Sequence, residues 1–177
     1  MIPITRRVSI ARAKSKSPLK QEGGTSVEDN FNKSLGNPKG KAEDNVWTRY
    51  EEDNTIDMQD TARHATSSQY TTEALRNKMP LGLGNSMVGR IASATGANLL
   101  GAAHEAKGLY TQIKGGRRVV SAVAESAEDL INNFAGSMVG AIGNSNMDKS
   151  KNKIIDKMVK HLPDGRAKES MYKRKPL

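Results

Sequence analysis

Residues 118–142 read RVVSAVAESAEDLINNFAGSMVGAI. Within this stretch, apolar side chains recur every three or four residues, the spacing that places them on one face of an α-helix. The residues of this apolar stripe are Val119, Val123, Ala127, Leu130, Phe134 and Met138. This is the clearest helical period in the chain, and it predicts a helix from about Arg118 to Ile142.

Three further helices are predicted on either side of this one. The first opens near Asn54 or Asp57, where capping and acidic side chains suit a helix N-terminus, and it runs to about Arg76. The others cover about residues 85–110 and 148–161. Only 4% of the residues are aromatic, and small apolar side chains favour closely packed helices over a β-sandwich. We therefore expect an all-α fold, a small bundle of three to four helices.

The net charge of +9 is concentrated at the two ends of the sequence. Residues 1–41 hold nine Lys/Arg against three acids, and residues 144–177 hold ten against four. We expect residues 1–53 to form an extended basic arm without regular structure, because their apolar residues are isolated. Residues 54–143 are the predicted helical core domain. Residues 144–177 are predicted to form a short amphipathic helix and a basic tail.

Several classes of protein are disfavoured by composition. The chain has no cysteine, so no disulfide can stabilise it, and its first residues lack the apolar stretch of a signal peptide. The most apolar segment, residues 87–103, contains an arginine, an asparagine and several glycines, and we expect no membrane span. Synthesis in the cytoplasm is the expectation.

Three polar clusters interrupt the predicted helices. They read DTARHA at residues 60–65, HE at residues 104–105 and DLINNFAG at residues 129–136. In the third cluster, Asp129, Asn133 and Gly136 share a helix face beside the apolar stripe, at the edge of the core or in a cleft.

The order of these clusters resembles a helical domain of bacterial and tailed-phage proteins that carries DxxRHA, HE and DxxNNxxG motifs. The match covers roughly residues 57–143. It departs where the family often has an aromatic residue after RHA, and where Glu128 replaces a methionine. The resemblance implies a bundle whose interior polar site gathers seven side chains: Arg63, His64, His104, Glu105, Asp129, Asn132 and Asn133.

Two interpretations of this polar set remain open. In the first, His64, His104, Glu105 and Asp129 are catalytic, either through acid/base chemistry or through a divalent metal held by the two histidines and a carboxylate. The chain has no HExxH sequence and no phosphate-binding loop, and no cofactor is predicted. In the second, the set is a structural network with Asp60 paired to Arg63, the histidines bonded to backbone or carboxylates, and Asn132 and Asn133 joining helices.

Our leading hypothesis for function is a structural or internal protein of a tailed-phage virion, made in the host cytoplasm. Its arm would contact other virion proteins in a multi-subunit assembly, through Arg6, Arg7, Arg12 and Trp47. The alternative is a hydrolase, for example one that degrades cell walls, that uses the polar site. A third hypothesis is a virion component that binds nucleic acid through its basic ends, or a membrane through its glycine-rich second helix.

Overall fold

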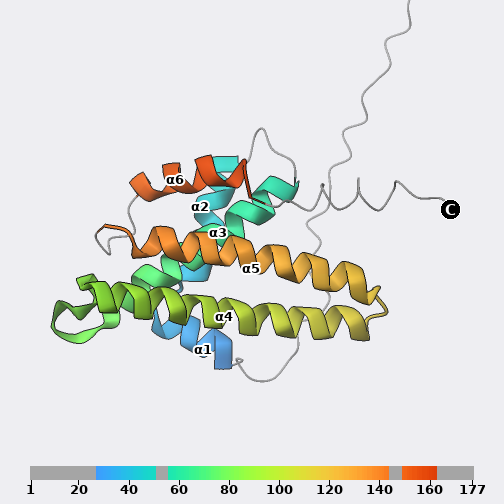
Figure 1. The fold of residues 1–177 in the computed structure, drawn as a ribbon, viewed down its shortest axis with the longest axis horizontal. Coiled ribbons are helices and arrows are strands. Elements are labelled where there is room, and N and C mark those ends of the chain that lie inside the picture. Colours follow the sequence, from blue (N-terminus) through green and yellow to red (C-terminus); the bar gives the residue numbers. More distant parts are fainter. Residues whose placement is uncertain (1–26, 51–55, 144–148, 163–177) are drawn as a thin grey trace, which may run out of the picture.

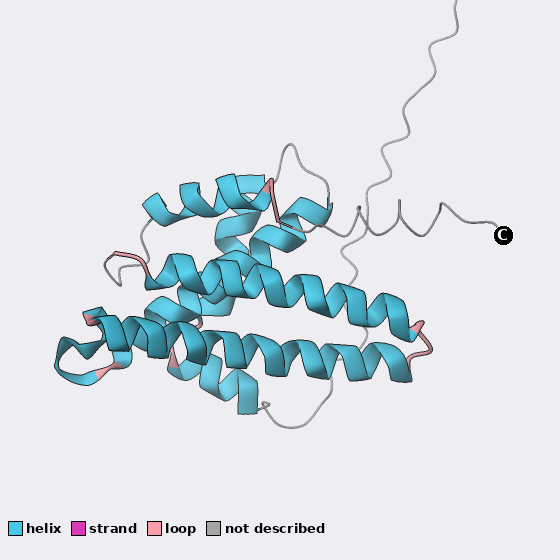
Figure 2. Ribbon diagram, viewed as in Figure 1, coloured by secondary structure: helices cyan, strands magenta, loops and turns pink. Residues whose placement is uncertain are grey.

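The computed structural model describes residues 27–50, 56–143 and 149–162, and these residues contain no β-strand. Seven helices lie in these ranges: α1 (Val27–Ser34), α2 (Pro38–Tyr50), α3 (Ile56–Lys78), the 3-10 helix η1 (Pro80–Asn85), α4 (Met87–Lys114), α5 (Val119–Ala141) and α6 (Lys149–Val159) (Figure 2). The all-α class predicted from the sequence is confirmed. The four predicted helices correspond to α3, α4, α5 and α6.

Helix α3 lies at the centre of the described fold. It packs against α5, α4 and α2, and more briefly against α6. Helices α4 and α5 form a long antiparallel hairpin whose turn lies at residues 115–118 (Figure 1). Ser86 caps α4, because its hydroxyl accepts a hydrogen bond from the Gly89 amide at 3.1 Å.

The contact between α3 and α5 is close because glycine and alanine form it. A Cβ atom added to Gly136 would lie 1.9 Å from the Ala65 carbonyl oxygen, and one added to Gly140 would lie 2.6 Å from the Gln69 carbonyl oxygen. The backbones of the two helices therefore meet directly. This approach brings the residues one or two turns away on each helix into the same small volume.

Polar side chains fill much of the interior along α3. Glu73 is fully buried and accepts a hydrogen bond from the Lys151 ammonium of α6 at 2.6 Å. The buried Arg76 guanidinium donates to the carbonyl oxygens of Gly84, Gly140 and Gly143. Arg76 thus connects the C-terminal end of α3 to η1 and to the C-terminal end of α5.

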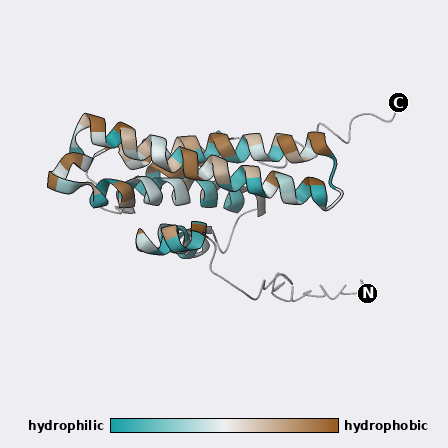
Figure 3. Cartoon of the chain, turned by 90° about the horizontal axis from the view of Figure 1, so that it is seen from below, coloured by the Kyte–Doolittle hydropathy of each residue, from teal (hydrophilic) through white to brown (hydrophobic). Residues whose placement is uncertain are grey.

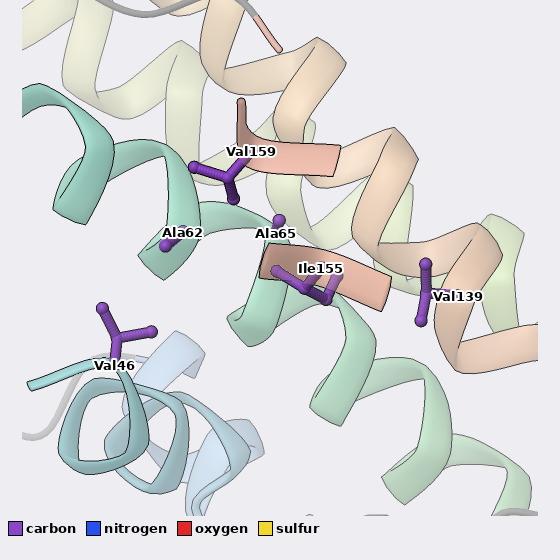
Figure 4. Close-up of a cluster of buried hydrophobic side chains, with 6 residues drawn as sticks. All are labelled: Val46, Ala62, Ala65, Val139, Ile155 and Val159. Carbon is purple, nitrogen blue, oxygen red and sulfur yellow. The ribbon is translucent and has the colours of Figure 1, made fainter. Parts of the chain in front are cut away.

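The apolar core is small by comparison (Figure 4). It is a cluster of buried residues from α2, α3, α5 and α6, namely Val46, Ala62, Ala65, Val139, Ile155 and Val159. Arg49 of α2 adds an ion pair to Asp156 of α6 and a hydrogen bond to the Thr66 hydroxyl of α3. This end of the bundle is therefore held by both apolar and charged contacts.

The apolar stripe of α5 faces outward. Val119, Val123, Leu130, Phe134 and Met138 are all exposed, by 39–58%. The buried face of the helix is made of small and polar residues instead: Ala122, Ser126, Asn132, Asn133, Ala135, Gly136, Ser137, Val139 and Gly140. Figure 3 shows hydrophobic segments along the outside of the α4–α5 hairpin.

The expectation that residues 1–53 contain no regular structure is wrong for residues 27–50, which form α1 and α2. Ala42 and Val46 lie one turn apart on α2 and are buried, and together with Arg49 they dock this helix. Trp47, a predicted partner contact, is 59% exposed on α2.

Arg6, Arg7 and Arg12 lie outside the described residues, as does the predicted basic tail from residue 163 onward. None of the described helices combines the length and the apolarity needed to cross a bilayer.

Candidate functional site

His64 is the centre of a cluster of carboxylates drawn from three helices. Its Nε2 atom lies 3.7 Å from an Asp60 carboxylate oxygen on the same helix and 3.5 Å from one of Asp129 on α5. Its Nδ1 atom lies 3.6 Å from a carboxylate oxygen of Glu105 on α4. Both ring nitrogens therefore face carboxylates, and the side chains of His64, Glu105 and Asp129 are largely buried.

The close contact between α3 and α5 places two of these groups. Ala65, next to His64, touches Gly136, and Asp129 lies seven residues before Gly136 on the same face of α5. Helix α4 packs against α5 at Gly101, where an added Cβ would lie 3.0 Å from the side-chain nitrogen Nδ2 of Asn133. Glu105, one turn after Gly101, therefore points into the same region. The small residues of the motifs thus set the positions of the ionisable ones.

Burial controls the charges of the cluster. Desolvation lowers the pKa of His64 to about 4, against the opposing negative charge of Asp60. Desolvation also raises the pKa of Glu105, although the His104 charge and a hydrogen bond with Asp129 act against this rise. The imidazole is therefore neutral at pH 7. The Oε1 atom of Glu105 is buried and has no hydrogen-bond partner.

A cavity of about 260 Å³ opens beside the cluster. Both His64 and Glu105 line it, so the carboxylate cluster forms part of its wall. Other wall residues come from α1, α2, α3, α4 and α5, and they include Glu28, Lys39, Arg63, Ser67, Thr71, His104 and Asn133. The apolar residues Phe31, Leu35, Ala97 and Leu100 complete the wall and make it largely apolar, and the cavity gives a small ligand access to His64 and Glu105.

The sequence-predicted site residues separate into two groups. His64, Glu105 and Asp129 converge with Asp60, whereas the His104 Nδ1 atom lies 2.8 Å from a carboxylate oxygen of Glu28 on α1. Sequence reasoning missed Glu28, because it assigned no structure to this segment.

The remaining predicted residues lie around the cluster. The guanidinium of Arg63 is half exposed and forms an ion pair with Asp60. Asn133 is buried in the cavity wall, and Asn132 is buried with its Oδ1 atom unpaired. Asp60 and Arg63 therefore match the structural pairing that the sequence suggested, while Asp60 also belongs to the cluster.

The donor set fits a divalent cation. One ligand atom each from Asp60, His64 and Asp129 lies within 4.8 Å of the other two, and a neutral imidazole has a lone pair to donate. Mixed imidazole and carboxylate ligands suit Zn²⁺ and Mn²⁺, and catalytic zinc sites commonly use three protein ligands. The sequence suggested a metal set of His64, His104 and a carboxylate, whereas the candidate set in the structure is His64 with two aspartates and does not include His104.

No family model matches the sequence, and no similar curated protein or solved structure is found. The interpretation of the site therefore depends on its geometry.

Proposed function

We propose that the chain is a metal-dependent hydrolase whose centre is formed by Asp60, His64, Glu105 and Asp129. The observation that carries this proposal is the convergence of three carboxylates at 3.5–3.7 Å from one imidazole, from helices α3, α4 and α5. The three carboxylates come from three different helices, so the tertiary fold brings them together and their positions in the sequence do not. The cavity beside His64 and Glu105 adds the space that a substrate needs.

Each residue of the centre has a role in this proposal. Asp60, His64 and Asp129 would hold the cation, which when bound would supply Lewis-acid activation of water and of a substrate oxygen. Glu105, whose buried Oε1 atom has no hydrogen-bond partner, would act as the general base. Arg63, at the cavity wall, is placed to bind an anionic or polar group of the substrate. We propose cell-wall polymer as the substrate class, since the wall is rich in hydrogen-bonding groups.

Metal binding and hydrolysis test the proposal separately. The full-length chain, freed of metal by a chelator, is titrated with Zn²⁺ and with Mn²⁺ in a calorimeter, and its activity is assayed on purified cell walls by zymogram. We expect one cation per chain and cleared zones. Asp129→Asn should lower the cation affinity at least about tenfold, since even changes outside the ligand shell cost about 10–100-fold.

The matched control is Glu128→Gln, which removes a carboxylate from the adjacent position of α5, outside the cluster. It should leave cation affinity within about twofold of the wild type, because Glu128 contributes no ligand atom to the cluster. A wild-type chain that binds neither cation and releases nothing from cell walls would show that the cluster is a structural network.

A second candidate function is a structural role in a tailed-phage particle, through assembly with other virion proteins. It is supported by the exposed apolar side chains of α4 and α5, because such surfaces usually meet a partner. Mass spectrometry of purified particles should detect peptides of this chain at a fixed ratio to a capsid protein. Particles that contain none of its peptides would exclude this role.

A further inference from the structure

The α4–α5 hairpin exposes a long apolar face, which we call the outer face. It contains six large apolar residues of α4 and eight at or next to α5: Met87, Val88, Ile91, Leu99, Tyr110, Ile113, Val119, Val120, Val123, Leu130, Ile131, Phe134, Met138 and Ile142. Several of these side chains are exposed by more than 60%, including Met87, Leu99 and Val120. At 1.5 Å per residue, the α5 part of the face is about 35 Å long.

The outer face lies on the side of the hairpin away from α3. Helix α4 meets α3 at Gly96, and α5 meets α3 at Gly136 and Gly140. The two helices also meet each other, through Gly101 and Asn133. The contacts made by α4 and α5 come from small and polar residues, so their large apolar side chains occupy the remaining side of each helix. A soluble monomer rarely exposes so continuous an apolar surface, which therefore indicates a binding surface.

Basic residues border the outer face, most densely at the turn of the hairpin. Lys114, Arg117 and Arg118 are exposed there, beside the exposed Tyr110 and Val120. In Figures 1 and 3 this end of the hairpin extends beyond the other described helices. The four acidic residues of the hairpin are placed differently: Glu105 and Asp129 belong to the inner cluster, Glu125 forms an ion pair with Arg117, and Glu128 is half-buried on α5. The border is therefore net positive.

We propose that the outer face of the α4–α5 hairpin binds the surface of an anionic lipid bilayer. Amphipathic helices that lie in the plane of a membrane combine an apolar face with a border of lysine and arginine. The apolar side chains enter the boundary between headgroups and acyl chains, while the basic border binds the lipid phosphates. None of the described helices is apolar enough to cross the bilayer, so the hairpin lies on it.

Charge favours an anionic membrane over a second copy of the chain. A second copy would present the same basic border, whereas an anionic surface complements it. The aromatic residues Tyr110 and Phe134 also suit the interface, because their rings are apolar and Tyr110 adds a polar hydroxyl. The inference is independent of the proposed hydrolytic centre, which lies on the inner side of the same helices.

Co-sedimentation with vesicles tests the proposal. The full-length chain is mixed with vesicles of phosphatidylcholine alone and with vesicles that contain one-third phosphatidylglycerol. We expect binding to the mixed vesicles at least about tenfold stronger than to the neutral ones, and weaker binding as salt rises from about 0.1 to 0.5 M. Equal binding to both vesicles at all salt concentrations would contradict the role of the basic border.

Two double variants separate the apolar from the charged contribution. Val120→Glu/Phe134→Glu should lower binding to the mixed vesicles at least about tenfold, and Lys114→Glu/Arg118→Glu should remove the preference for anionic lipid. Val27→Glu is the matched control, since Val27 is 88% exposed on α1, and it should bind as the wild type does. All these positions are exposed, and circular dichroism verifies that the variants keep their helices.

Light scattering after gel filtration tests the alternative, in which the outer face is a contact between two copies of the chain. A stable wild-type dimer that Val120→Glu/Phe134→Glu dissociates, together with no binding to either vesicle, would identify the outer face as a contact between copies and overturn the lipid proposal. A monomer that binds anionic vesicles through these residues supports it.

Discussion

Replacing Gly136 by alanine tests whether the contact between α3 and α5 is as close as the structure indicates. The new Cβ would lie 1.9 Å from the backbone carbonyl oxygen of Ala65, whereas ordinary contact begins at 3.4 Å. The helices must therefore move apart by about 1.5 Å, since a backbone atom cannot turn aside as a flexible side chain can. This shift would also move Asp129 away from His64.

The expected loss of stability follows from two opposing terms. Overpacking a close contact costs about 1–3 kcal/mol, and this position is at the upper end because both atoms belong to backbones or are fixed to them. Alanine is about 0.5–1 kcal/mol better than glycine inside a helix, which offsets part of the cost. We expect Gly136→Ala to lower the free energy of unfolding by about 2 kcal/mol, or the melting temperature by about 4–8 °C.

Gly108→Ala in α4 is the matched control, because nothing lies within 4 Å of its added Cβ. It should raise the free energy of unfolding by about 0.5–1 kcal/mol through helix propensity alone. Both variants are unfolded by heat and by urea, with helix content followed by circular dichroism. If Gly136→Ala were as stabilising as Gly108→Ala, the two helices could not be in backbone contact, and the account of how the site is positioned would be refuted.

Three further predictions concern buried charges and the site. Lys151→Met leaves the buried Glu73 carboxylate without its cation and should cost about 3–5 kcal/mol in urea unfolding, whereas Glu73→Leu/Lys151→Met should recover most of the loss. His64 has its pKa lowered from 6.5 to about 4, so only the unfolded chain gains a proton between these values. The metal-free wild type should therefore lose about 2 kcal/mol relative to His64→Asn as the pH falls from 7.5 to 5, and parallel stability curves would contradict this pKa. Zn²⁺ at a hundred times its Kd should raise the free energy of unfolding by about 2.7 kcal/mol, and a tenfold weaker affinity in Asp129→Asn should reduce this to about 1.4 kcal/mol or less at the same Zn²⁺ concentration in a thermal melt.

The helices of the core were predictable from the sequence, because their apolar period and their ends are both local properties. The prediction of a helix over about residues 118–142 corresponds to α5, Val119–Ala141. The helices α1 and α2 were not predictable in this way. Helix α1 buries no residue, and the buried apolar residues of α2 and of the link before it are Leu35, Pro38, Ala42 and Val46, too few and too irregularly spaced to form a clear period.

The apolar stripe of α5 does not reveal which face of the helix is buried. Periodicity identifies two unlike faces, and burial of the apolar one is usual in a soluble monomer. Here the face of Asn132, Asn133, Gly136 and Gly140 is buried, because α3 offers a polar surface and a backbone that only small residues can approach. Which face is inside therefore depends on the partner helix, which lies far away in the sequence.

The sequence predicted which residues form the site better than it predicted how they are arranged. The spacing of DxxRHA, HE and DxxNNxxG placed His64, Glu105 and Asp129 on three helices, and these three do converge. Adjacent positions on a helix point about 100° apart, so His104 and Glu105 could not both face the same cluster. His104 instead contacts Glu28 on α1, a helix without an apolar period in the sequence.

Helix α5 carries both proposed functions on opposite faces, which makes them separable. Asp129 points inward to His64, while its neighbours Leu130 and Ile131 are exposed on the outer face. A charge added at Phe134 should weaken vesicle binding and leave the cation affinity within about twofold, because effects of separate contacts are nearly additive. Asp129→Asn should do the reverse. If either change instead altered both the vesicle affinity and the cation affinity, binding at one face of α5 would affect the other face. Membrane binding would then regulate the site through the Gly136 contact.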